Sequence, residues 1–334
     1  MSSVSALPRR GLTGNSLSVS ELSLGCAQLG NLHREVSDTE ARATVDSAWE
    51  LGIRYFDTAP HYGLGLSERR LGAALARRPR VDYVLSTKVG RLLEPVDRPA
   101  GLDDGGFAVA ATHRRVWDFS RDGIRRSLEE SLRRLGLEQV DIVYLHDPDD
   151  HWDDVVQSGY PALAELRVEG VVGAIGAGMN QSRLLADLVC LADVDVVMLA
   201  GRYTLLEQEA LDDLLPACET RGVSVVAAGI FNSGLLARQR PTEGARYDYG
   251  DAPRELVERA RAIASVCERH GTTLPAAAIA FPLGHPAVAS VCVGARSSQQ
   301  IEHDADLYRE TIAADLWSEL KAERLLRDDA PTPA

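Results

Sequence analysis

The feature that most constrains the fold is the regular return of short apolar segments between longer helical patterns. Each segment is apolar almost throughout, which is typical of strands covered on both faces of a parallel sheet. We therefore predict eight buried strands, at 21–27, 53–58, 83–89, 140–146, 171–178, 195–200, 223–229 and 288–295.

Helical patterns fill the intervals between these strands. The first begins with Ser37 and Glu40, the spacing of a capping box, and ends at Gly52. The main predicted helices are 37–52, 120–136, 161–170, 181–192, 207–222, 253–271 and 297–310. Eight strand–helix units favour a closed barrel over an open doubly wound sheet. We predict an α/β fold in which residues 1–334 form one (β/α)8 TIM barrel domain.

Three segments fall outside this repeat. Gly14-Asn15 separates two short alternating runs, which predicts an N-terminal β-hairpin within residues 1–20. The connections 90–119 and 230–252 are long and follow strands, so we expect them on the catalytic, C-terminal face of the barrel. Residues 328–334 are predicted to be a flexible tail.

The composition argues against several classes of function. The net charge is −13 and the Lys and Arg residues form no cluster, so we expect no nucleic-acid partner. The five cysteines have no metal-type spacing, which predicts no metal site and fits reduced thiols in the cytoplasm. The start has no secretory signal, and the charge-free segment 271–295 contains too many Pro and Gly residues to span a membrane. We expect a cytoplasmic monomer or small homo-oligomer, and read 271–295 as a helix, a turn and a buried strand.

Polar side chains follow three neighbouring strands. Asp57 and Tyr62 come at the end of the second strand, Lys88 near the end of the third and His146 at the end of the fourth. Barrel enzymes place their chemistry at these ends, so the four should converge. A lysine paired with the acid favours phenolate and lowers the pKa of a tyrosine, which can then exchange a proton with a substrate oxygen. Each of the four residues alone has a plain structural explanation, but their occurrence in order at three neighbouring strand ends favours catalysis. The adjacent His61 faces either the substrate or the solvent.

These residues lie in motifs that resemble the aldo-keto reductase superfamily. The stretches are "GIRYFDTAPHYGLGLSERRLG", "LSTKVG" and "VDIVYLHDPD", in that order between residues 52 and 149. The resemblance implies an NAD(P)-dependent oxidoreductase on a (β/α)8 barrel. It also implies that the catalytic residues are Asp57, Tyr62, Lys88 and His146.

The resemblance further implies an extended dinucleotide cofactor, NAD or NADP, over the top of the barrel. The segment 293–304 resembles the loop that binds the adenosine phosphates in that family. Amide groups at the start of the following helix, together with Arg296, suit a phosphate, whereas the alternative is that Ser297 only caps the helix and Arg296 is solvated. The predicted cofactor contacts are Cys26, Asp57, Gly178, Asn180, Gly294, Arg296, Ser297, Gln300 and Asp304.

The chain also departs from the family pattern. Gly178 and Met179 stand where many members have Ser-Asn, with Asn180 one place later, and Ala200 replaces a frequent Gln. Gln300 occupies a place where members that prefer NADP often carry Arg. The loss of this positive charge implies that NAD is tolerated and is the candidate for the preferred cofactor.

Within the superfamily, "YGLGLSERRLG", "YLHDPDD" and "GAGMNQS" resemble the aldose 1-dehydrogenases (L-fucose or D-threo-aldose dehydrogenase) and the pyridoxal 4-dehydrogenases. This resemblance implies oxidation of the hemiacetal of an L-fucose, D-arabinose or L-galactose type sugar at C1 to the lactone, with Tyr62 taking the hydroxyl proton. The alternatives are oxidation of pyridoxal, a general aldehyde or ketone reductase, and a cofactor-binding regulatory subunit. Trp117 either stacks on the sugar or packs its own loop.

Overall fold

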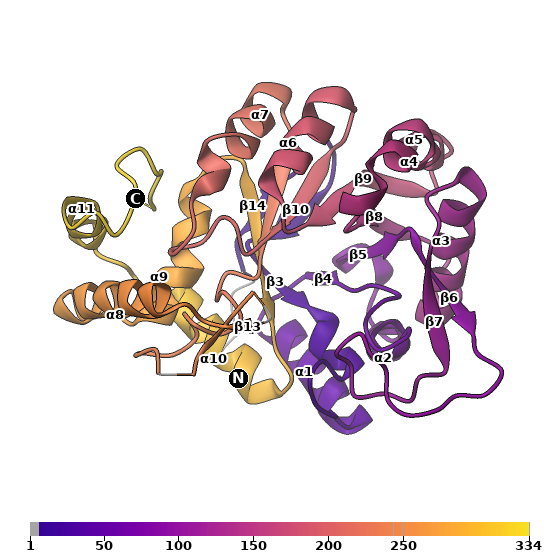
Figure 1. The fold of residues 1–334 in the computed structure, drawn as a ribbon, viewed down its shortest axis with the longest axis horizontal. Coiled ribbons are helices and arrows are strands. Elements are labelled where there is room, and N and C mark those ends of the chain that lie inside the picture. Colours follow the sequence, from indigo (N-terminus) through magenta and orange to yellow (C-terminus); the bar gives the residue numbers. More distant parts are fainter. Residues whose placement is uncertain (1–6, 243, 249, 334) are drawn as a thin grey trace.

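A closed barrel of eight parallel strands forms the centre of the computed structural model, which describes residues 7–333 except 243 and 249 (Figure 1). The last strand of the barrel pairs with the first, so the sheet has no open edge. The predicted strands and the (β/α)8 barrel are confirmed. The barrel strands are β3 (Leu22–Gly25), β4 (Tyr55–Asp57), β5 (Val84–Val89), β8 (Val140–His146), β9 (Val172–Met179), β10 (Val196–Ala200), β11 (Ser224–Ala228) and β14 (Val288–Gly294).

Helices surround the barrel, and most of them bury apolar side chains in the main core (Figure 1). They are α1 (Asp38–Glu50), α2 (Leu66–Leu75), α3 (Arg121–Leu135), α4 (Trp152–Asp154), α5 (Tyr160–Val168), α6 (Ser182–Leu191), α7 (Leu214–Arg221), α8 (Arg254–Arg269), α9 (Leu274–Ala280), α10 (Ser298–Arg309) and α11 (Ala314–Ala322). The capping box of Ser37 and Glu40 is present at the start of α1. The helix, turn and strand expected in 271–295 are α9, a 3₁₀ turn and β14.

One predicted helix was wrong in extent and another was missed. The segment 207–222 holds a short 3₁₀ helix, Glu209–Leu211, and then α7, because the Asp213 carboxylate accepts a hydrogen bond from the amide of Leu214 and begins a new helix there. The unpredicted helix α11 buries Leu316 and Trp317 against the core.

The N-terminal hairpin closes the barrel at the amino-terminal ends of its strands. It consists of β1 (Arg9–Gly11) and β2 (Ser18–Ser20). The side-chain amide of Asn15 donates to the carbonyl of Gly173 and to the carboxylate of Asp195, both near the starts of barrel strands. Leu12 and Val19 join the apolar cluster inside the barrel. The predicted hairpin is confirmed over residues 9–20, and residues 1–6 lie outside the described residues.

The two long connections are more ordered than predicted. The first contains an antiparallel ribbon of β6 (Arg91–Pro95) and β7 (His113–Trp117), in which Arg91 pairs with Trp117 (Figure 1). The second contains the two-residue strands β12 (Arg246–Tyr247) and β13 (Gly250–Asp251). Both connections follow barrel strands, β5 and β11, and so extend from the C-terminal face as expected.

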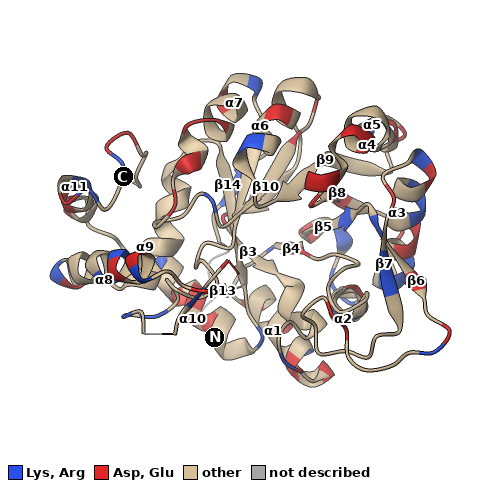
Figure 2. Cartoon of the chain, viewed as in Figure 1, with Lys and Arg blue, Asp and Glu red and all other residues tan. Residues whose placement is uncertain are grey.

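Charged residues lie mainly on the outer helices, with acidic and basic side chains interspersed (Figure 2). Near the C-terminus, Ala330 is buried, and a Cβ on Gly284 would come within 2.5 Å of the backbone of Thr332. The flexibility of residues 328–334 stays a prediction. In the described part of the chain, no helix is long and apolar enough to cross a membrane, and no group of three potential ligands could hold a metal ion.

Candidate active site

Four polar side chains meet at the carboxyl ends of β4, β5 and β8. The Nζ of Lys88 donates to Oδ2 of Asp57 at 2.5 Å and to the hydroxyl oxygen of Tyr62 at 3.0 Å. The rings of Tyr62 and His146 meet edge to face, with their centroids 5.9 Å apart. Asp57, Lys88 and His146 are buried, and Tyr62 is half-buried. The structure therefore brings together all four residues that the strand ends predict.

Hydroxyl groups inside the barrel hold the second oxygen of Asp57. The hydroxyl of Ser86 donates to Oδ1 of Asp57 at 2.7 Å. The hydroxyl of Tyr55 lies 3.1 Å from that of Ser86 and 3.1 Å from that of Tyr144. A buried carboxylate is costly unless its oxygens are hydrogen-bonded. This chain of hydroxyls and the ammonium of Lys88 together satisfy both oxygens and fix the position of the carboxylate.

The pKa shifts of Lys88 and Tyr62 agree with the prediction for the lysine but not for the tyrosine. Burial lowers the pKa of Lys88, but the Asp57 carboxylate and the Tyr62 phenol outweigh it, so the pKa is raised and the amine stays an ammonium. Burial raises the pKa of Tyr62, and the opposing effect of Lys88 is smaller. The expected net lowering of the Tyr62 pKa is therefore wrong, because removing the phenolate from water costs more than one neighbouring cation returns.

His146 is a neutral imidazole in this environment. Burial first, and then the positive charges of Arg91 and Lys88, lower its pKa well below the usual value. Its Nδ1 is buried and has no hydrogen-bond partner among the described residues. A neutral imidazole at this place can hold a substrate oxygen without adding a charge.

His61 lies inside the site rather than on the surface. Its ring centroid is 5.5 Å from that of His146 and 5.2 Å from that of Phe107. Burial, followed by the charges of Arg91 and Arg115, lowers its pKa to about 2. The solvent-facing alternative for His61 therefore does not hold, and its contact with a substrate stays a prediction.

Trp117, at the end of β7, packs the ribbon against the site. The guanidinium of Arg91 lies 4.1 Å from its ring centroid. The ring of Phe119 stacks at 5.8 Å, and that of His151 lies at 5.0 Å. The packing alternative for Trp117 is thus seen directly. Its side chain is still 40% exposed, so stacking on a sugar stays a prediction.

The start of α10 offers donors for an anionic group. The hydroxyl of Ser297 accepts from the amide of Gln300 at 3.4 Å, and the side-chain oxygen of Gln300 accepts from the amide of Arg296 at 3.0 Å. The amides of Ser298 and Gln299 open the helix, where no preceding turn can accept from them. Free amides at a helix start, beside a half-buried arginine, fit a phosphate, and so this donor set suits a dinucleotide.

The other predicted cofactor residues of this region are Gly294, which ends β14, Asp304 within α10, and Cys26, which directly follows β3. Gly294 is exposed, and a Cβ there would come within 2.7 Å of the end of the Gln28 side chain. Burial raises the pKa of Asp304, in α10, to about 7. Cys26 is fully buried, its Sγ donates to the carbonyl of Leu24 at 3.6 Å, and burial raises its pKa. Their cofactor contacts stay predictions.

Gly178 lies near the end of β9, next to Lys88, and Asn180 directly follows that strand. A Cβ on Gly178 would sit 3.8 Å from Cε of Lys88, so a small residue leaves room over the lysine. Asn180 lines a cavity of about 430 Å³, whose wall also includes Arg202 and Asp248, joined by an ion pair of 2.9 Å. Asn180 therefore faces open space at the C-terminal end of the barrel.

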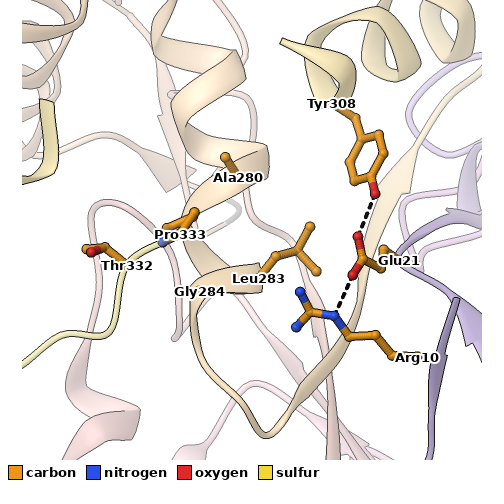
Figure 3. Close-up of a pocket in the computed structure, with 8 residues that line it drawn as sticks. All are labelled: Arg10, Glu21, Ala280, Leu283, Gly284, Tyr308, Thr332 and Pro333. Atoms are coloured by element: carbon orange, nitrogen blue, oxygen red, sulfur yellow. Dashed lines mark hydrogen bonds and ion pairs between the residues drawn. The ribbon is translucent and has the colours of Figure 1, made fainter. Parts of the chain in front are cut away.

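A second cavity, of about 440 Å³, lies at the opposite end (Figure 3). Glu21 precedes β3 and Gly284 precedes β14, so both mark the amino-terminal ends of the strands. Figure 3 shows the carboxylate of Glu21 between Arg10 and Tyr308, with hydrogen bonds of 2.6 and 2.5 Å. Among the described residues that line it, the two charged side chains, Arg10 and Glu21, are paired with each other, and we assign the cavity no chemistry.

Two charged residues of the site were not predicted. Arg91, at the start of β6, forms an ion pair with Asp147, which directly follows His146. Asp147 is part of the motif "YLHDPDD", so its position directly after His146 could have identified it as a site residue. Arg91 was hidden in a segment predicted to be a loop, because its strand partner Trp117 lies far along the chain.

The sequence is similar to those of known oxidoreductases. The chain matches the Aldo/keto reductase family over residues 21–323. It is 50% identical to a D-threo-aldose 1-dehydrogenase from Pseudomonas sp, over 95% of this chain and 96% of that protein. It is 38% identical to a pyridoxal 4-dehydrogenase from Microbacterium luteolum, over 96% of this chain and 98% of that protein.

Solved structures agree with the fold. A holo-form aldo-keto reductase from Bacillus halodurans superposes with a TM-score of 0.75 at 27% identity, over 96% of this chain and 97% of that one. The family match covers the eight barrel strands and all four converging residues. The chain therefore belongs to the aldo/keto reductase family.

Proposed function

We propose that this protein oxidises the cyclic hemiacetal of an aldose at C1 to the lactone, with NAD(P)+ and with Tyr62 as proton acceptor. Its family makes it an oxidoreductase. The relative of 50% identity acts, by its name, on D-threo-aldoses, which supports a sugar of the L-fucose, D-arabinose or L-galactose type. The observation that carries the proposal is the 3.0 Å contact between Nζ of Lys88 and the hydroxyl of Tyr62.

The proposed roles follow from the contacts. Oxidation of a C–OH group requires a base for the hydroxyl proton, and Tyr62 has the one hydroxyl among the four converging residues. The ammonium of Lys88, held at 2.5 Å by Asp57, stabilises the phenolate as it forms. Neutral His146 orients the substrate oxygen beside the phenol. When bound, the nicotinamide supplies the hydride acceptor.

The raised pKa of Tyr62 predicts how oxidation depends on pH. Because burial disfavours the phenolate, only a small fraction of Tyr62 is deprotonated at neutral pH, and this fraction grows as the pH rises. We expect kcat/KM for aldose oxidation to increase between about pH 7 and pH 9, by up to about tenfold per unit. Initial rates in overlapping buffers measure this. A flat or falling profile would contradict the assignment of Tyr62 as the base.

We infer that the dinucleotide phosphates lie at the start of α10, held by the free amides there and by Arg296. Members of the family use NAD(P)(H), and we propose that this chain prefers NAD because Gln300 carries no charge. Replacing Gln300 by Arg should raise the ratio of kcat/KM with NADP+ to that with NAD+ about tenfold, through a charge-assisted bond to the 2′-phosphate. Gln139→Arg, at an exposed position just before β8 and so at the opposite end of the barrel, is the matched control. Equal effects of the two variants would argue against the assignment.

A substrate panel tests the proposed activity. The purified protein is incubated with aldoses, pyridoxal or simple aldehydes, each with both cofactors in the appropriate redox state. We expect NAD(P)H to form fastest with an aldose. Pyridoxal is the second candidate, favoured by the relative of 38% identity. Reduction of aldehydes without oxidation of any sugar would make the protein a general reductase, and cofactor binding without turnover would support a regulatory subunit.

We also propose a cytoplasmic location and a monomer or small homo-oligomer. All five cysteines are free, which supports a reducing compartment. Fractionation and size-exclusion chromatography measure the two properties.

A further inference from the structure

Asp147 occupies an unusual position beside the reacting groups. Its Oδ2 lies 3.6 Å from Nε2 of His146 and accepts a hydrogen bond of 2.5 Å from Nη2 of Arg91. Its backbone is in the left-handed region, with φ of 39°, and its amide donates to the carbonyl of Gly178 at 2.9 Å. Aspartate tolerates this conformation better than most residues, and such strain persists where the surroundings enforce it. The turn thus aims the carboxylate at the rim of the barrel.

The second oxygen of this carboxylate has no partner within the described part of the chain. The Asp147 side chain accepts one hydrogen bond from the described residues, at Oδ2, and it is 41% exposed. Arg91, by contrast, is only 12% exposed and is clamped over the ring of Trp117. The arginine is therefore fixed and holds one carboxylate oxygen in place, while Oδ1 stays free to accept a hydrogen bond from a ligand.

The neighbours of Asp147 indicate which ligand group would meet it. Tyr62 and His146 would hold the oxygen on the reacting carbon, and Asp147 directly follows His146 beside that place. In a cyclic aldose, the polar groups nearest to the C1 hydroxyl are the ring oxygen and the C2 hydroxyl, and of these two only the C2 hydroxyl can donate a hydrogen bond. A carboxylate can only accept hydrogen bonds, so it selects a hydroxyl over a hydrogen or a methyl group.

We propose that Asp147 is a specificity-determining residue whose Oδ1 accepts a hydrogen bond from the C2 hydroxyl of the aldose, and that Arg91 is its positioning residue. The inference rests on the proposed function, because it names the part of the sugar that the same site recognises. Asp147 would also favour polyhydroxylated aldoses over simple aldehydes, because a simple aldehyde has no hydroxyl group to donate to the carboxylate.

Replacing Asp147 by Asn tests the inference with little change in shape. The amide has a single oxygen, which the fixed guanidinium of Arg91 would hold, so an NH₂ donor would replace the acceptor that faces the sugar. The substrates are D-arabinose and 2-deoxy-D-ribose, which is the same sugar without its C2 hydroxyl. We expect the wild-type protein to prefer D-arabinose about 10- to 100-fold in kcat/KM. In Asp147→Asn this ratio should fall to within a few-fold of one.

Two further variants separate recognition from folding. Asp153→Asn, an exposed acid in the nearby helix α4, should keep the wild-type ratio. Arg91→Met should lower the ratio without altering Asp147, because the carboxylate is no longer held in place. Far-UV circular dichroism checks that each variant is folded.

The outcomes distinguish the inference from the proposed function. If the wild type oxidises D-arabinose but Asp147→Asn keeps its preference, or loses activity equally on both sugars, the role of Asp147 is overturned and the sugar oxidation stands. If the wild type oxidises neither these sugars nor other aldoses but reduces aldehydes, the proposed function fails and the inference fails with it.

Discussion

Replacing Tyr62 by Phe is expected to lower kcat for aldose oxidation about 10²- to 10⁴-fold, the range for loss of a general acid–base group. The ring remains, so its edge-to-face contact with His146 can persist and the KM should change little. What is lost is the hydroxyl 3.0 Å from Nζ of Lys88. Steady-state kinetics with saturating cofactor measure both constants.

Tyr308→Phe is the matched control for this prediction. Its hydroxyl bonds to Glu21 at the opposite end of the barrel (Figure 3). That variant should keep wild-type kcat, even if it loses some stability. Should Tyr62→Phe retain kcat within tenfold of the wild type, Tyr62 would not be the proton acceptor.

Replacing Arg134 by Met is expected to lower the free energy of unfolding by about 3–5 kcal/mol, the cost of leaving a buried charge without its partner. Glu68, in α2, has a fully buried side chain. Its Oε2 accepts from Nε of Arg134 at 2.5 Å, and its Oε1 accepts from the hydroxyl of Thr87 at 2.8 Å. Thr87 is adjacent to Lys88 in β5. The hydrogen bond between Glu68 and Thr87 therefore links α2 to the strand that carries the catalytic lysine.

Urea denaturation of two further variants tests whether charge burial is the cause. Arg254→Met removes an exposed pair within α8, Arg254 with Glu258, and should leave the free energy of unfolding almost unchanged. In the Arg134→Met background, Glu68→Gln should recover part of the lost stability, because the remaining buried group is then neutral. If the two arginine variants are equally stable, the buried pair contributes no more than a surface pair.

The barrel and the convergence of its polar residues were predictable because both depend on local pattern. A parallel strand covered on both faces must be apolar, and its carboxyl end must lie at the catalytic rim. These two rules place Asp57, Lys88 and His146 together without any knowledge of distant contacts. The capping box at Ser37 is equally local, since its two partners are three residues apart.

What could not be predicted depends on partners remote in sequence. The ribbon of β6 and β7 was missed because residues 96–112 separate its strands, so no short turn marks it. The net direction of the Tyr62 pKa was wrong because it depends on how deeply the phenol is buried. The role proposed for Asp147 likewise needs Arg91, which reaches it only through that ribbon.

Transfer of deuterium from C1 of a labelled aldose tests the central claim most directly. The wild-type protein is incubated with C1-deuterated L-fucose and oxidised cofactor, and both products are analysed by mass spectrometry. Oxidation at the hemiacetal carbon predicts one deuterium in the reduced cofactor and an unlabelled lactone. A sugar product that keeps its deuterium, with an unlabelled reduced cofactor, would contradict oxidation at C1.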